Sequence, residues 1–147
     1  MANKWDLVKD VRERKLTHVQ TLAMDSAKRA NDLSQSLEQV KSYISDYKTQ
    51  LSGDEKQGVS VTTLSRTRNF IQKLVGASNE QEKLLSKLKQ QAEQDRLKLN
   101  QCRADVKAVD RLQEKDREQQ KHAAAKKEAH LMDELANRRF SSLTKKF

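Results

Sequence analysis

The sequence predicts an all-α protein, a long two-helix antiparallel coiled-coil hairpin, from three observations. Apolar and small residues recur at alternating steps of three and four in two runs, over residues 19–51 and 71–109. A short glycine-containing segment separates the runs, and no proline interrupts either one. Alternating steps of three and four place each run on one narrow face of a slightly supercoiled helix. Two such faces joined by a loop are expected to pair antiparallel.

The composition favours an extended helical protein over a globular core. The chain has 147 residues, of which 35% are charged and 35% hydrophobic, whereas globular chains are usually about half apolar. Disorder is the alternative for such a composition, but sustained periodicity is not expected of a solvated coil. The net charge is +9, with acids and bases interleaved along the chain, which suits a solvated helix surface or a partner with an acidic surface.

The first helix is predicted over about residues 3–51 and the loop over residues 52–60. Gly53 is the expected residue after the helix end, and Ser60 or Thr62 the expected N-cap of the next helix. The seam of the first helix has ten positions: Val19, Ala23, Ser26, Ala30, Leu33, Leu37, Val40, Ile44, Tyr47 and Leu51.

The second helix is predicted over about residues 61–138, followed by a frayed tail over residues 139–147, so that residues 1–147 form one coiled-coil hairpin. Its seam positions are Ile71, Leu74, Ser78, Gln81, Leu85, Leu88, Ala92, Asp95, Leu99, Cys102, Val106 and Val109. After Val109 the apolar period is lost.

The predicted loop sets a register in which Val40 meets Ile71 and Trp5 meets Val106. The next register that keeps the heptad phase lies one heptad further along the second helix and needs a longer loop. In the predicted register the beginning of the first helix lies opposite about residue 108 of the second. The second helix therefore overhangs it and lacks an intramolecular partner from about residue 110.

Asp95 and Arg12 are polar residues on or near the predicted seam. In the predicted register Asp95 faces Leu16, one layer from Arg12. The two could form a register-fixing pair, or remain two solvated side chains at a weakly packed end. The sequence leaves both interpretations open.

Additional side chains lie beside the seam on both helices, all on the same flank. They are Ser36 and Tyr43 on the first helix, and Phe70, Ala77 and Leu84 on the second. The predicted register puts Tyr43 beside Phe70. A two-helix hairpin cannot cover this flank, so exposed aromatic groups there indicate a partner surface. The alternative is that the rings only shield the seam from water.

No constellation for catalysis or for cofactor or metal binding is found in the sequence. The three glycines are isolated, the three histidines fit no metal spacing, and Cys102 occupies a seam position. We therefore expect no enzyme activity, no cofactor, no metal and no small-molecule substrate. Nucleic acid is not an expected partner, because aromatic residues do not interleave with the basic ones.

The location of the chain is predicted from three absences. The N-terminus has no signal-peptide pattern, no segment has transmembrane length, and the lone cysteine cannot form an internal disulfide. A reduced, cytoplasmic setting is the simple inference.

The pattern along both helices resembles the flagellar export protein family FliJ. The residues that carry the resemblance are Leu37, Val40, Tyr43, Tyr47 and Leu51, then Leu64, Phe70, Ile71, Leu74, Ala77, Gln81 and Leu84, and finally Met132-Asp133-Glu134-Leu135-Ala136. The related injectisome stalk proteins share this layout and remain an alternative, as does a generic cytoplasmic coiled-coil scaffold or nucleic-acid-associated protein.

The resemblance implies a non-enzymatic stalk of the type III export apparatus, cytoplasmic and peripherally associated with the inner membrane. Its implied partners are the hexameric export ATPase, the cytoplasmic domain of the export gate membrane protein, and export chaperones. Carried over by position, the gate-binding surface is Val40, Tyr43, Tyr47, Phe70, Leu74, Ala77 and Gln81, with Ser36 at its edge. The sequence departs from the family pattern at Ser36, Val40 and Gln81, where larger or more polar groups are expected.

The unpaired end of the hairpin is the expected contact with the ATPase ring. A basic rod end suits a ring lumen lined with acids. The residues expected to make this contact are Leu7, Val11, Arg12, Arg14, Arg103, Lys107, Arg111 and Lys115.

Overall fold

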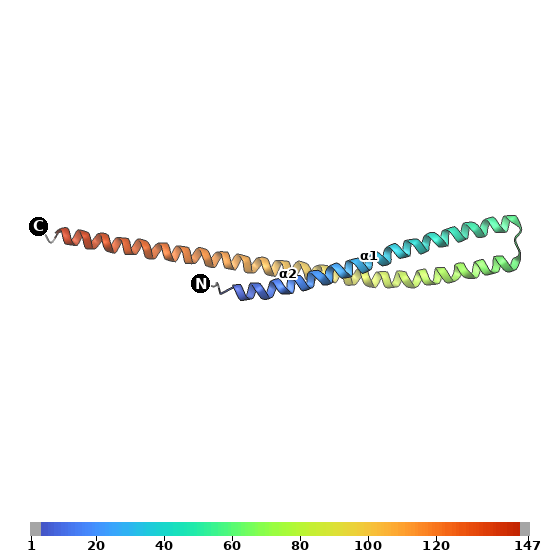
Figure 1. Ribbon diagram of the computed structural model, residues 1–147, viewed down its shortest axis with the longest axis horizontal. Coiled ribbons are helices and arrows are strands. Elements are labelled where there is room, and N and C mark those ends of the chain that lie inside the picture. The colour runs from blue at the N-terminus through green and yellow to red at the C-terminus, as the bar shows by residue number, and fades with distance from the viewer. Residues whose placement is uncertain (1–3, 145–147) are drawn as a thin grey trace. The chain divides into compact units, whose positions relative to one another are not determined.

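A computed structural model describes residues 4–144 and contains two long α-helices (Figure 1). Helix α1 spans Asp6–Gln57 and helix α2 spans Val61–Thr144. The two helices pack against each other, and no strand occurs in residues 4–144. The predicted all-α, two-helix architecture is confirmed.

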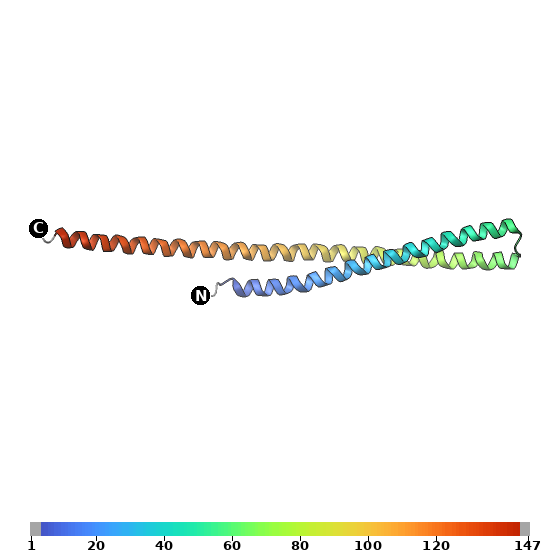
Figure 2. The same cartoon turned by 45° about the horizontal axis from the view of Figure 1, so that its top comes forward.

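The chain divides into two compact units. The loop unit consists of residues 17–101, and the terminal unit combines the chain up to Leu16 with the chain from Cys102 onward. In the loop unit α1 and α2 lie side by side in both views (Figures 1 and 2). Each unit contains a segment of both helices, so each has its own stretch of seam.

The predicted seam is the core of both units. Every predicted seam position of the loop unit is buried or half-buried, with Leu37 and Ile71 among the most enclosed. In the terminal unit Cys102 is buried and Val109 is fully enclosed, at 0% exposure. The seam also continues past Val109, where Gln113 is buried and donates a hydrogen bond to Asp6 at 2.7 Å. The period is therefore kept beyond Val109 by a polar residue, which an apolar pattern does not detect.

Helix α1 runs past the predicted end at residue 51, so the connection is only residues 58–60. Gly53 lies inside the helix, and Gly58 follows the helix end with φ of 75°. The Val59 N–H donates to the Asp54 carbonyl at 3.2 Å, as in a Schellman motif. An internal glycine costs only about 1 kcal/mol, and the half-buried side chains of Leu51 and Asp54 continue the seam across it.

The start of α2 is set by a hydroxyl cap, and its late end by the absence of helix-breaking glycine and proline. The Ser60 side chain accepts a hydrogen bond from the Thr63 N–H at 3.3 Å, which confirms Ser60 as the N-cap of α2. At the far end α2 extends to Thr144, so residues 139–144 of the predicted frayed tail are helical. Residues 145–147 lie outside the described part of the chain. No glycine or proline follows Gly76 to end the helix earlier.

The register differs from the predicted one by about one heptad in each unit. In the loop unit Lys41 pairs with Glu82 at 2.6 Å. In the predicted register the equivalent position on α2, one heptad earlier, is Val75. In the terminal unit Asp6 is bonded to Gln113, eight residues beyond the expected level. The register prediction was wrong because the residues assigned to a long loop instead lengthen α1. The heptad phase is the same in both registers, so the pattern alone does not distinguish them.

Asp95 supplies a polar contact that does distinguish the registers. Its buried carboxylate accepts hydrogen bonds from the Ser26 hydroxyl and from Gln91. The bond from Ser26 holds the pKa of Asp95 below its usual value, although burial acts in the opposite direction. Arg12, for which a pair with Asp95 was one of two possibilities, instead donates to the backbone carbonyl of Asp105 at 3.0 Å. Moving α1 by one heptad would carry Ser26 away and leave the Asp95 carboxylate facing Leu16.

Disulfide trapping is expected to report this register. Ser34 and Lys89 lie one heptad along each helix from the Lys41–Glu82 pair, so cysteines at both positions should crosslink. The combination of Ala27→Cys with Lys89→Cys tests the register one heptad away. It shares one cysteine with the first pair, and neither pair disturbs an ion pair between the helices. In the otherwise unchanged chain we expect the first crosslink to dominate.

The same two cysteine pairs then measure what the Asp95 contact contributes. In Asp95→Leu we expect the second crosslink to gain at the expense of the first, because the Ser26–Asp95 bond then no longer favours the observed register. Every variant carries Cys102→Ala to remove the native thiol. An unchanged crosslink ratio in Asp95→Leu would show that another feature sets the register.

Replacing Gly58 by alanine is expected to lower the free energy of unfolding by about 1–2 kcal/mol, because an L-residue is strained at positive φ. Gly76→Ala is the matched control. Gly76 lies within α2, and a Cβ there would meet nothing within 4 Å, so that variant should gain about 1 kcal/mol. Urea unfolding followed by circular dichroism measures both. Equal shifts in the same direction would contradict the Gly58 cap.

Candidate protein-binding surfaces

The aromatic flank of the loop unit is built around one ring contact between the helices. We use this name for Ser36 and Tyr43 on α1, for Phe70, Ala77 and Leu84 on α2, and for the seam residues Val40, Tyr47, Leu74 and Gln81 that border them. The Tyr47 and Phe70 rings meet edge-to-face, with centroids 5.0 Å apart and planes at 81°. Because of the one-heptad difference in register, Tyr47 rather than Tyr43 is the ring beside Phe70.

The aromatic flank leaves large apolar groups in contact with solvent. Tyr43 is 57% exposed and Phe70 is 44% exposed, while Leu84 is also exposed. Of the residues predicted to bind the export gate, Tyr43, Phe70 and Ala77 are therefore accessible, whereas Val40, Tyr47, Leu74 and Gln81 are half-buried in the seam. The exposed members can contact a partner directly, and the half-buried members lie in the seam beside them.

Gln81, one of the seam residues that border the aromatic flank, has a side-chain oxygen without a hydrogen-bond donor among residues 4–144. Its side-chain oxygen is buried and accepts no hydrogen bond in the described part of the chain. A buried acceptor without a donor costs about 1–3 kcal/mol, so this oxygen is a weak point of the seam under the aromatic flank.

The opposite edge of the seam carries ion pairs in place of aromatic groups. Lys41 pairs with Glu82 at 2.6 Å, and Arg68 pairs with Glu55. The two pairs lie two heptads apart along both helices. Exposed ion pairs of this kind contribute about 0–1 kcal/mol each, so their main effect is to make the two edges of the loop unit chemically different.

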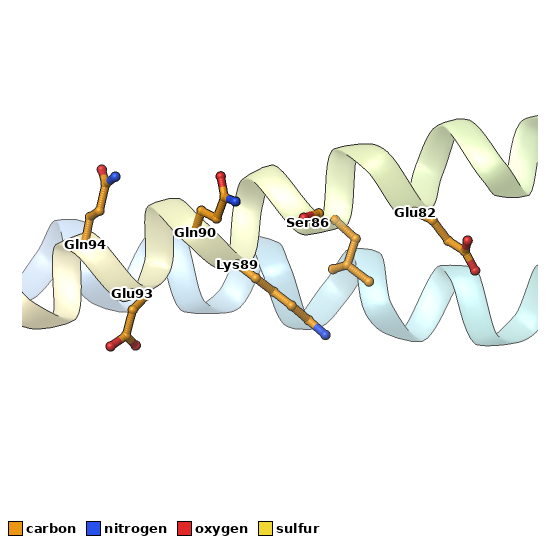
Figure 3. Close-up of a pocket in the computed structure, with 7 residues that line it drawn as sticks. Glu82, Ser86, Lys89, Gln90, Glu93 and Gln94 are labelled. Carbon is orange, nitrogen blue, oxygen red and sulfur yellow. The ribbon is translucent and has the colours of Figure 1, made fainter.

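A shallow groove lies on the outer surface of α2 in the loop unit (Figure 3). All seven of its lining residues come from α2, and Leu85 is the one apolar side chain among them. Gln90 and Gln94 point away from Lys89 and Glu93 (Figure 3). The groove brings together no arrangement of groups for acid–base or nucleophilic chemistry.

The terminal unit presents a basic row, which we define as Arg103, Lys107, Arg111 and Lys115. These residues recur every four positions on α2, and all four are exposed. None of them forms an ion pair within residues 4–144. Lys9 lies beside the row but is engaged by Asp110 at 2.8 Å, an interaction that raises the Lys9 pKa. The basic row therefore keeps its charge available to a partner.

The α1 residues predicted to contact the ATPase fall into two groups. Leu7 and Val11 are exposed, as a docking residue should be. Arg14 is paired with Asp10 at 3.1 Å, and Arg12 is half-buried and bonded to a backbone carbonyl. Arg12 thus supports packing within the terminal unit and offers less to a partner than the basic row does.

Sequence reasoning missed a third surface, at the end of α2. Here Leu131, Met132, Leu135, Phe140 and Leu143 are all exposed. Met132, Ala136, Phe140 and Leu143 follow steps of four, four and three in the sequence. The frayed tail predicted from residue 139 left the last two outside the predicted helix.

Within residues 4–144 no three histidine, cysteine or acidic side chains gather closely enough to hold a metal ion. Neither described helix has a stretch long and apolar enough to cross a membrane.

Comparison with known proteins gives one match. No curated protein and no solved structure matches this chain. The model of the family described as "Flagellar FliJ protein" matches residues 2–144. This match includes both helices, the loop between them and the described end of α2. The chain therefore belongs to the flagellar FliJ protein family.

Proposed function

We propose that this chain is a non-enzymatic stalk and coupling protein of the flagellar type III export apparatus. It would bind the hexameric export ATPase, the cytoplasmic domain of the export gate membrane protein, and export chaperones. The observation that carries the proposal is the family match over nearly the whole chain. The two-helix architecture supports it, since such a chain offers long surfaces for contact. The same layout would serve an injectisome, which is the alternative within this class.

The aromatic flank is the proposed contact with the export gate. Exposed aromatic side chains are enriched among residues that dominate interface energies. The edge-on contact of Tyr47 holds the Phe70 ring in place before a partner arrives, which reduces the entropy lost on binding. The ion pairs on the opposite edge favour docking of an apolar surface on the aromatic side alone.

The basic row is the proposed contact with the ATPase, together with exposed Leu7 and Val11. Four unpaired cations along one side of a helix suit an acidic lining, and such complementarity raises association rates and fixes orientation. In this assignment Arg12 acts from within the terminal unit by holding α1 against α2 through the Asp105 carbonyl.

The proposed location is the cytoplasm, with peripheral association at the inner membrane. Membership of the flagellar FliJ protein family supports a role in flagellar export. Chaperone binding is carried over from the family without assigned residues.

Phe70→Ala and Leu74→Ala are each expected to weaken binding of the soluble gate domain by at least about tenfold, as for a central interface residue. Calorimetric titration measures the dissociation constant, and circular dichroism checks that helicity is kept. Lys41→Ala, on the opposite edge, is the matched control and should change the constant little. Equal losses in all three variants would remove the aromatic flank from the gate interface.

Reversing charge along the basic row, with Arg103→Glu and Lys107→Glu, is expected to reduce stimulation of the export ATPase severalfold and to flatten its salt dependence. Lys28→Glu with Arg29→Glu makes the same charge change in the loop unit and should leave stimulation intact. Stimulation that survives reversal of the basic row would contradict this contact.

A coiled-coil scaffold is the competing function from another class. It would bind neither the ATPase nor the gate domain in pull-down experiments. Loss of motility on deletion of the chain would separate flagellar use from injectisome use.

A further inference from the structure

The last turns of α2 carry large apolar side chains that nothing in their own unit covers. Every described residue from Arg117 to Thr144 is exposed. Within that stretch Phe140 is 70% exposed and Leu143 is 60% exposed. In both views no other ribbon of the terminal unit runs beside this end of α2 (Figures 1 and 2).

These side chains form one continuous face, which we call the terminal stripe. At 3.6 residues per turn its members fall within an arc of roughly 140°. The members are Met132, Leu135, Ala136, Phe140 and Leu143. Together with Arg139 they line a shallow groove along the helix, so a cation lies directly among the apolar groups.

The charge along this part of the chain changes abruptly within the stripe, after Glu134. Residues 117–134 contain four lysines and arginines and four acids, so they are formally neutral. After Glu134 the sequence contains no acid and four bases, namely Arg138, Arg139, Lys145 and Lys146. The last two lie outside the described residues and enter only as sequence. The stripe members from Leu135 onward therefore coincide with the unbalanced positive charge, whereas Met132 is followed by Asp133 and Glu134.

This combination of a short apolar face and nearby bases distinguishes between two kinds of partner, a second helix and a bilayer surface. A helical partner would be expected to extend the stripe over three or four heptads, as the seam does, and to match acids with bases along its edges. The terminal stripe covers fewer than two heptads, and from Leu135 onward the sequence around it offers one sign of charge. Amphipathic helices that lie at a bilayer surface combine a short apolar face with lysine and arginine around it.

We propose that the terminal stripe binds the surface of a membrane rich in anionic phospholipid. Phe140 and Leu143 insert at the boundary between headgroups and acyl chains, while Arg138 and Arg139 lie against the phosphates. The bases attract the anionic surface, and insertion of the apolar side chains adds to the binding. This contact concerns lipid alone and stands independently of the proposed stalk function.

Cosedimentation of the full chain with vesicles tests the proposal. Vesicles of phosphatidylglycerol mixed with phosphatidylcholine are the probe, and vesicles of phosphatidylcholine alone are the reference. We expect pelleting with the anionic vesicles only, falling as salt is raised. Equal pelleting with both compositions, or none with either, would overturn the proposal.

Variants locate the contact. Arg138→Glu with Arg139→Glu should weaken vesicle binding by at least about tenfold, and Phe140→Asp should weaken it severalfold. Because these side chains are exposed, the helix should persist, which circular dichroism verifies. Arg117→Glu with Lys121→Glu makes the same charge change outside the stripe and should alter binding by less than about twofold, since it acts beyond the screening length. Equal losses in both charge-reversal variants would overturn the assignment to the stripe.

A second copy of the chain is the remaining occupant to test. Sedimentation equilibrium of the lipid-free protein measures its average mass. If Phe140→Asp lowers that mass and leaves vesicle binding unchanged, the stripe pairs with another copy and the lipid proposal is wrong. A mass that is the same in both proteins, with vesicle binding lost in Phe140→Asp, supports lipid contact.

Discussion

The packing of one narrow face of α1 against one narrow face of α2 is the constraint on which the other features depend. Neither helix has a second layer, so each residue is either in the seam or on the surface. A seam with small and polar members stabilises less per layer than an apolar one, yet Ser26, Ser78 and Asp95 are kept there. The Ser26–Asp95 bond accounts for one such exception, because it favours one register over another of equal heptad phase.

Register in turn determines which surface groups become neighbours. The observed pairing places Tyr47 against Phe70 and Lys41 against Glu82. A shift of one heptad would separate both pairs while keeping the same residues in the seam. The contact surfaces of the loop unit therefore depend on a few polar interactions within the seam and at the loop, and less on the apolar packing that provides most of the stability.

The seam positions could be predicted from sequence because burial follows spacing alone, and every predicted position is buried or half-buried. The register could not, because it depends on where α1 ends. Gly53 and Gly58 both lie in the segment between the two apolar runs, and only the structure shows which one has positive φ. The aromatic flank was identified by its members, but its central ring pair was not, since the change of register moves Tyr43 away from Phe70 and brings the seam residue Tyr47 beside it.

The end of α2, unlike the seam, is not stabilised by packing against α1. Beyond Asp116 its helicity must come from local terms, such as the alanines at residues 123–125 and the absence of glycine and proline. Side-chain pairs along a helix add only a few tenths of a kcal/mol each. None of these local terms requires Phe140 or Leu143, because polar helix formers would maintain the helix equally well and would be more soluble. The apolar groups at this end therefore need an explanation in contact with something outside the chain, and the positive charge that surrounds them favours an anionic surface.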